Sequence, residues 1–376
     1  MPSVLHEVDP DGGLIAVLKE PNTQRVIPDI YLPPPKGSEN PDFVLDSTEV
    51  LTNFDCSGYP SKEDQDDGSP LEIRYRVSSR HLMLASVTFK KMLSGPWKEA
   101  SPGDQEPSSS EVSHSPCIHI REVSAIGWHA DALLTVFKII HSQCSEVPCA
   151  VSLKYLTNVA LIANYYQCAG ALSLAVQLWI KQGYGFKWFK ESGLPYGTKL
   201  IMWLFIAWVF SQSPLPGNAA HQGLLFEASR SVTHESYGLS YIETYDLPIS
   251  EILAPLEKKR LNGLRSLTSA LSNMNGKVKR NELGCDNHRC TAMVIGSLEL
   301  NLEEHPELTV EDGNYDGLSI KDVINAVQDE FGPSEDEMQD GMHLCTPKSL
   351  MKHIIKDVQR EIRFSPDWPV RKGIML

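Results

Sequence analysis

Residues 71–93 read LEIRYRVSSRHLMLASVTFKKML. Every second residue of the first seven is apolar, and this is the period of a strand with one buried face. From Leu82 onward the apolar residues recur at helical spacing instead. Ser78 or Ser79 can cap that helix, and Ser86 can cap a second one. The stretch therefore predicts a strand followed by two short helices.

The surrounding sequence supplies further elements of both kinds. Residues 42–45 and 117–120 are short apolar runs that predict two more strands. Three helices are predicted after Trp128, the second of them capped by Ser152. Their apolar stripes are Leu133, Leu134, Phe137 and Ile140, then Leu153, Leu156, Val159, Ala160 and Ala163, then Leu172, Ala175, Leu178 and Trp179. These elements predict an α+β fold, in which a small sheet is flanked by a larger helical part.

Beyond Gly183 the pattern is mainly helical, over residues 198–211 and 249–272. Residues 200–210 are the most apolar run of the chain. A membrane span needs about 20 apolar residues, so this run predicts a buried core helix.

Residues 299–340 hold fourteen acidic residues and a single basic one, Lys321. This acidic stretch predicts a solvated, partly disordered surface, with an acidic partner-binding tail as the alternative.

Composition narrows the class of protein. The chain has 34 basic and 48 acidic residues and a net charge of −14, which argues against a dedicated nucleic-acid binder. Its eight cysteines are spread over 376 residues, unlike the dense disulfide framework of a small secreted domain. No basic segment precedes an apolar run near residue 1, so no signal peptide is expected. We expect an intracellular protein, cytoplasmic or nuclear, without a membrane partner.

The stretch quoted first also resembles the first helical hairpin of a BTB/POZ domain. In that family a strand is followed by His, an apolar helix, Ser, Phe and a closing apolar pair. The matching residues here are His81, Leu82, Leu84, Ser86, Phe89, Met92 and Leu93. Trp97-Lys98-Glu99 resembles the fungal subgroup, and residues 128–141 and 147–168 are similar to its later helices. Residues 42–45 are the candidate for the family's opening strand.

The resemblance implies a domain organisation and a function. It implies a BTB/POZ-like domain over residues 42–185, preceded by a flexible extension (1–41) and followed by a helical region (186–280) and a C-terminal segment (281–376). Such domains form homodimers or bind other proteins through exposed helices and sheet edges. Some are adaptors for the cullin scaffold of ubiquitin ligases, and others recruit transcription factors. We expect His81 to be a core histidine bonded to backbone, and Phe89 and Met92 to fill the core.

No known catalytic motif occurs. Dinucleotide-binding and phosphate-binding glycine loops, the G-x-S-x-G elbow and the H-E-x-x-H zinc motif are all missing from the sequence. We therefore expect neither catalytic nor cofactor-binding residues. Two alternatives remain open beside the interaction module: a zinc-dependent hydrolase built on the C-terminal half, and a transcriptional regulator.

One group of residues suggests a metal site. Cys285 and Cys290 lie five residues apart, and His343 and Cys345 follow later. Thiolate and imidazole ligands suit tetrahedral zinc, so these four residues are a candidate closed structural site. His288 competes with His343 for the fourth position. The alternative is that the cysteines and histidines are reduced, packed and unliganded.

Two short basic patches, residues 258–260 and 277–280, are open to two interpretations. They could serve as a nuclear import signal or contact nucleic acid. A solvated helix face is the alternative.

Overall fold

The computed structural model describes residues 3–32, 43–44, 72–94, 120–182, 198–210, 242–309, 315, 318–329, 331 and 345–363. The strands are β1 (Ser3–Glu7), β2 (Leu14–Lys19), β3 (Asp29–Leu32), β4 (Phe43–Val44), β5 (Glu72–Val77), β6 (Arg121–Ile126) and β7 (Ile242–Glu243). The helices are α1 (Ser79–Ala85), α2 (Val87–Ser94), α3 (Ala130–Ile140), α4 (Leu153–Tyr166), α5 (Ala169–Gln182), α7 (Thr198–Phe210), α9 (Ser250–Lys279), α10 (His288–Glu304), α11 (Ile320–Asp329) and α12 (Pro347–Arg363). Two 3₁₀ turns, Cys144–Glu146 and Pro306–Leu308, complete them.

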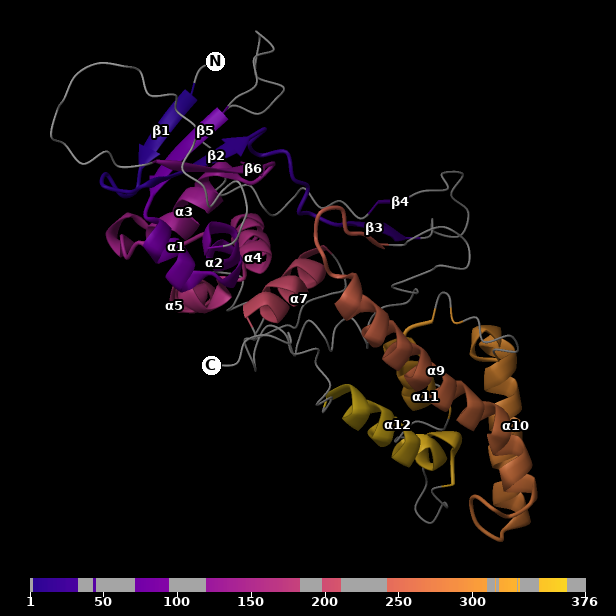
Figure 1. Ribbon diagram of the computed structural model, residues 1–376. Coiled ribbons are helices and arrows are strands. Elements are labelled where there is room, and N and C mark those ends of the chain that lie inside the picture. The colour runs from indigo at the N-terminus through magenta and orange to yellow at the C-terminus, as the bar shows by residue number, and fades with distance from the viewer. Residues whose placement is uncertain are drawn as a thin grey trace, which may run out of the picture.

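A four-stranded mixed sheet forms the first layer of the molecule. Its strand order is β1-β5-β2-β6. The pairs β1–β5 and β2–β6 are parallel, whereas the central pair β2–β5 is antiparallel. The helices α1 to α5 lie beneath one face of this sheet (Figure 1). The predicted α+β class is therefore confirmed.

The alternation in β5 decides which face of the sheet is buried. Ile73, Tyr75 and Val77 are buried, while the residues between them are only half-buried. Tyr75 packs edge-on against Phe137 of α3, with ring centroids 5.5 Å apart, and its hydroxyl donates to the Ala130 carbonyl. The predicted strand and the two short helices after it are thus confirmed.

Two strands near the start of the chain, β1 and β2, belong to the four-stranded sheet, which corrects the prediction of a flexible extension (1–41) for those residues; residues 33–41 lie outside the described residues. β2 is a central strand between β5 and β6. Its core is an almost unbroken apolar run, which is typical of a strand buried on both faces and carries no alternation for a period-two search to detect. Residues 42–45 are not the opening strand of this sheet, because β4 pairs with β3 in a separate three-stranded sheet.

A second strand prediction also needs correction. β6 covers Arg121–Ile126, not residues 117–120. Residues 117–119 lie outside the described residues. The sequence pattern does not predict β6, because only Val123 on this edge strand is buried and it therefore lacks a regular apolar alternation.

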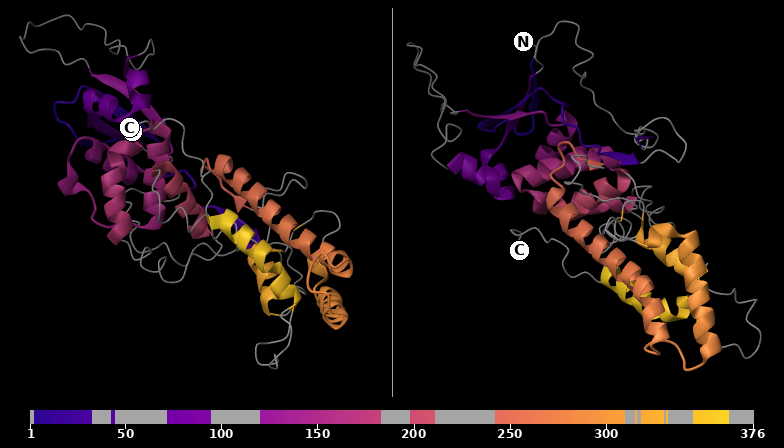
Figure 2. Two further views of the ribbon diagram at one scale, coloured as in Figure 1. Left: turned by 90° about the horizontal axis from the view of Figure 1, so that it is seen from below. Right: turned by 90° about the vertical axis from the view of Figure 1, so that its right-hand side faces the viewer.

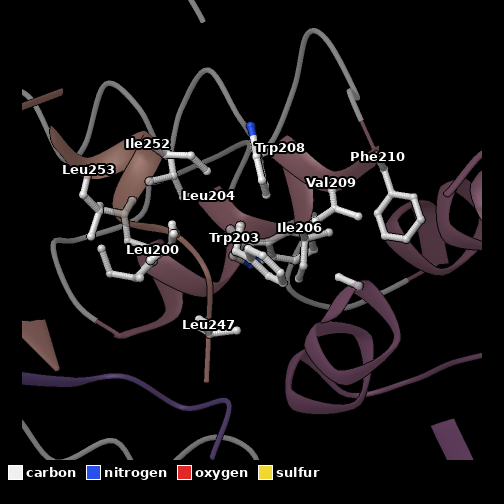
Figure 3. Packing of buried hydrophobic residues seen from close by; sticks show 14 of the residues in the cluster. Leu200, Trp203, Leu204, Ile206, Trp208, Val209, Phe210, Leu247, Ile252 and Leu253 are labelled. Carbon is white, nitrogen blue, oxygen red and sulfur yellow. The ribbon is translucent and has the colours of Figure 1, made fainter. Parts of the chain in front are cut away.

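Helix α7 connects the first core to the rest of the chain. Every side chain from Leu200 to Phe210 is buried, and the helix packs against α4 and α5. Figure 3 shows Leu200 and Leu204 beside Ile252 and Leu253 at the start of α9. The prediction of a buried core helix is confirmed, and the predicted boundary at residue 185 separates elements that share one core. Among the described residues, no helix has the length and apolar character to cross a membrane.

The segment before α9 also contacts the N-terminal part of the chain. β7 pairs with β3 in antiparallel fashion, so that Asp29 lies opposite Glu243. The Arg25 backbone N–H donates to the Asp246 carboxylate at 2.7 Å, and the Arg25 guanidinium lies 3.6 Å from the centroid of the Tyr245 ring. The N-terminal segment is therefore held by residues more than two hundred positions later.

The C-terminal part is helical. α10, α11 and α12 all pack against the long helix α9. Figures 1 and 2 show α9 and α10 side by side, extending away from the sheet. Within the acidic stretch, α11 is an ordered amphipathic helix that buries Ile320, Val323 and Ile324. The described residues of this stretch thus contribute a core face as well as a solvated one.

Candidate functional site

The α1–α2 hairpin is positioned by a histidine that sequence reasoning did not select. The Nε2 atom of His141 accepts the Ser78 backbone N–H at 2.9 Å, and its Nδ1 atom lies 2.8 Å from the Phe137 carbonyl. Burial lowers the pKa of His141, consistent with a neutral ring that donates at one nitrogen and accepts at the other. The expected role of His81 is wrong, because His81 is exposed and its ring only packs beside that of His141.

Ser86 locks the middle of the hairpin. Its hydroxyl accepts the Phe89 backbone N–H at 2.9 Å and donates to the Tyr166 carbonyl at the end of α4. The Phe89 ring stacks on the Tyr166 ring, with centroids 4.4 Å apart. The predicted capping role of Ser86 is confirmed, and Phe89 fills the core as predicted. Met92 is only half-buried and packs at the edge of that core.

On the opposite side, the hairpin presents apolar side chains to solvent. Leu84 at the end of α1 is 89% exposed, and Val87 at the start of α2 is 50% exposed. We call these two residues the hairpin patch. Val4 and Leu5 on the edge strand β1 are exposed as well. Large apolar side chains gathered on a surface are a common mark of protein–protein contact sites.

A pocket lies at the other edge of the sheet. Its volume is about 560 Å³, and it is lined by residues of β6, the following loop and the end of α4, including Ile126, Trp128 and Tyr165. Gln24 also lines it, and the Oε1 atom of this residue is buried with no hydrogen-bond partner among the described residues.

The described residues contain two separate clusters of side chains that could bind a metal ion. The ligand atoms of Asp9, His81 and His141 lie within 4.8 Å of one another. This group is unsuited to a metal ion, because both ring nitrogens of His141 already hydrogen-bond to backbone. A metal there would have to break the bond that holds the start of α1.

The second group is the predicted thiol cluster, Cys285, Cys290 and Cys345, whose sulfur atoms also lie within 4.8 Å of one another. His288 is exposed and is not a member of the group. His343 lies outside the described residues. The structure therefore brings together three of the four residues predicted to bind zinc.

The three thiols differ in their protonation chemistry. A hydrogen bond from the Asn287 backbone N–H lowers the pKa of Cys285. Burial raises the pKa of Cys290 to about 12 and also raises the pKa of Cys345. Cys285 is thus the thiol best prepared to become a thiolate, which is the form that binds metal ions and attacks electrophiles.

The basic patch at residues 258–260 is not a continuous cationic surface. Lys258 is exposed, but the Arg260 guanidinium is buried and forms two hydrogen bonds with the Glu257 carboxylate, at 3.0 and 3.1 Å. It also donates to the Leu318 carbonyl at 3.1 Å. Arg260 therefore joins α9 to the segment before α11, and it is unavailable to an import receptor or to nucleic acid.

Comparison with family models, with curated proteins and with solved structures finds no match to this chain. The assignment of a function consequently depends on the residues and the geometry described above.

Proposed function

We propose that this chain is an intracellular protein-interaction module of the BTB/POZ type, which acts by forming a homodimer or by serving as an adaptor in a larger complex. The observation that carries the proposal is the two-sided α1–α2 hairpin. One side is locked into the core through Ser86 and Phe89, while the other presents the hairpin patch to solvent. The resemblance of residues 71–93 to the family's hairpin supports the same conclusion.

The exposed side of the hairpin offers apolar side chains that a partner can bury. Complete burial of a leucine or valine side chain contributes about 1.5–3 kcal/mol relative to exposure in water. The rigid hairpin loses little conformational freedom when a partner binds, because its backbone is already capped. Edge strand β1 adds backbone groups that can pair with another strand, and its Val4 and Leu5 side chains are exposed.

Light scattering coupled to size-exclusion chromatography tests the proposal on the full chain. The full chain is needed because β3 pairs with β7 and α7 shares its core with α4. We expect a dimer for the natural chain and a monomer for Leu84→Asp. Leu174→Asp is the matched control, because Leu174 is 70% exposed on α5, outside the hairpin, and this variant should remain dimeric.

A monomeric natural chain would remove homodimerisation and leave the adaptor form. That form is tested by titrating a purified cullin N-terminal domain into the full chain in a calorimeter, again with Leu84→Asp and Leu174→Asp. Binding that only Leu84→Asp abolishes supports the adaptor. If the chain neither self-associates nor binds the cullin domain, the proposal fails.

A further inference from the structure

The thiol cluster joins segments that are distant in the sequence. Cys285 lies in the turn between α9 and α10, Cys290 in the first turn of α10, and Cys345 directly before α12. The Cys290 sulfur lies 4.0 Å from the carbonyl oxygen of Cys345, although 55 residues separate the two positions. The three thiols therefore meet where two helices begin.

The backbone around the cluster is fixed without help from the sulfur atoms. Asn287 caps α10 by accepting the Arg289 backbone N–H at 3.0 Å. Thr346 and Ser349 cap α12 reciprocally, each hydroxyl accepting the other residue's backbone N–H at 3.2 and 3.0 Å. Gly284 has a φ of +95°, a conformation that favours glycine, immediately before Cys285. Local sequence thus holds all three cysteines in place.

Three neighbouring thiols cannot all be satisfied by disulfide formation, because a disulfide pairs two sulfurs at about 2.05 Å and leaves the third alone. A metal ion can use all three. Sulfur ligands at about 2.3 Å from tetrahedral zinc lie about 3.8 Å apart. Small side-chain rotations convert a cluster held within 4.8 Å into that arrangement.

We propose that Cys285, Cys290 and Cys345 bind one Zn²⁺ ion as thiolates. Soft sulfur ligands select zinc over magnesium or calcium. Binding releases three thiol protons to solvent, and the three thiolates with the Zn²⁺ ion form a site of net charge −1. The ion closes the chain between Cys290 and Cys345 and joins the start of α10 to the start of α12. Three protein ligands leave the fourth tetrahedral position to a water molecule. The ion stabilises the C-terminal helices and is independent of the hairpin patch.

The first experiment measures zinc by elemental analysis on the full chain, purified without chelator and then equilibrated with Zn²⁺ and desalted. We expect one zinc ion per chain. Cys285→Ser should lose it, and this substitution is mild because Cys285 is only partly buried. The matched control is Cys144→Ser/Cys149→Ser, which replaces two exposed cysteines outside the cluster and should keep the ion.

Two further measurements keep the proposal falsifiable if Cys285→Ser folds poorly. Cobalt added to the natural chain after zinc removal should give the near-ultraviolet absorption of thiolate-to-cobalt charge transfer, together with the visible bands of a tetrahedral ion. Removal of zinc should lower the Tm of the natural chain, and its return should restore it. A natural chain that retains no zinc, a Cys285→Ser variant that retains a full ion, or a disulfide found within the cluster would overturn the proposal.

Discussion

The sheet-containing part and the α9–α12 part differ in what fixes their structure. Among its described residues the first part buries polar groups such as Ser86 and Asn158 but no Asp, Glu, Lys or Arg side chain. Strand pairing, together with hydrogen bonds from Ser86 and His141, sets its geometry. The second packs amphipathic helices against α9 and buries an ion pair, Glu257–Arg260, at 5% and 1% exposure. Amphipathic helices can pack in several registers, and a buried polar group with a single partner geometry selects one of them. The difference teaches that the sheet is specified by backbone pairing, whereas the helical part depends on a few polar contacts.

The largest expected effect comes from breaking the buried pair. Glu257→Leu leaves the Arg260 guanidinium buried without its carboxylate, and this should lower the free energy of unfolding by about 3–5 kcal/mol. Denaturant titration followed by circular dichroism measures the loss. The control is the double variant Glu257→Leu/Arg260→Met, which removes both charges and should recover most of the stability. Equal losses in the single and double variants would contradict the role given to the pair.

A smaller effect is expected from the anchor of the hairpin. Ser86→Ala removes the cap of α2 and leaves the Tyr166 carbonyl without that donor, which should cost about 1–3 kcal/mol. Ser78→Ala is the matched control, because the Ser78 side chain makes no capping hydrogen bond, and its change should stay within about 0.5 kcal/mol. Thermal unfolding gives the Tm of the Ser86→Ala and Ser78→Ala variants. If the two Tm values are equal, the hairpin is not held by Ser86.

The smallest effect contrasts two glycines of the helical part. A Cβ at Gly263 would lie 3.0 Å from the Ile320 side chain and 3.4 Å from that of Val358, whereas one at Gly296 would meet nothing within 4 Å. Gly296→Ala should therefore stabilise by about 0.5–1 kcal/mol through helix propensity. At Gly263 crowding should offset that gain or exceed it. Chemical denaturation measures the free energy of unfolding of Gly263→Ala and Gly296→Ala. Equal stabilisation by the two substitutions would show that α9 does not approach α11 and α12 this closely.

Local signals predicted the hairpin well, because strand period, helix spacing and the Ser86 cap all lie within about twenty residues. β2 escaped prediction because a strand buried on both faces lacks alternation. The anchoring role of His141 could not be inferred, since Ser78 lies 63 positions away and only the folded chain brings the two together.

The metal-ligating residues were predicted from residue type and spacing. Cys285 and Cys290 stand out as a near pair, and Cys345 could be added because it is the third and last cysteine of the C-terminal half. The burial of Arg260 could not be predicted from three consecutive basic residues. It depends on which face of α9 is covered by α11 and α12, a property of tertiary packing.

The pairing of β3 with β7 constrains the order of events during synthesis. Tyr245 donates its hydrogen bond to Asp29 across 216 residues of chain. At roughly 5–20 residues per second, a ribosome needs roughly 10–45 s to progress from one partner to the other. During that interval the nascent chain contains β3 without its partner strand β7, and α7 without the start of α9 that packs against it. Chaperone binding to unpaired edges of this kind would be concentrated in the middle of translation and would end when residues 242–253 leave the exit tunnel.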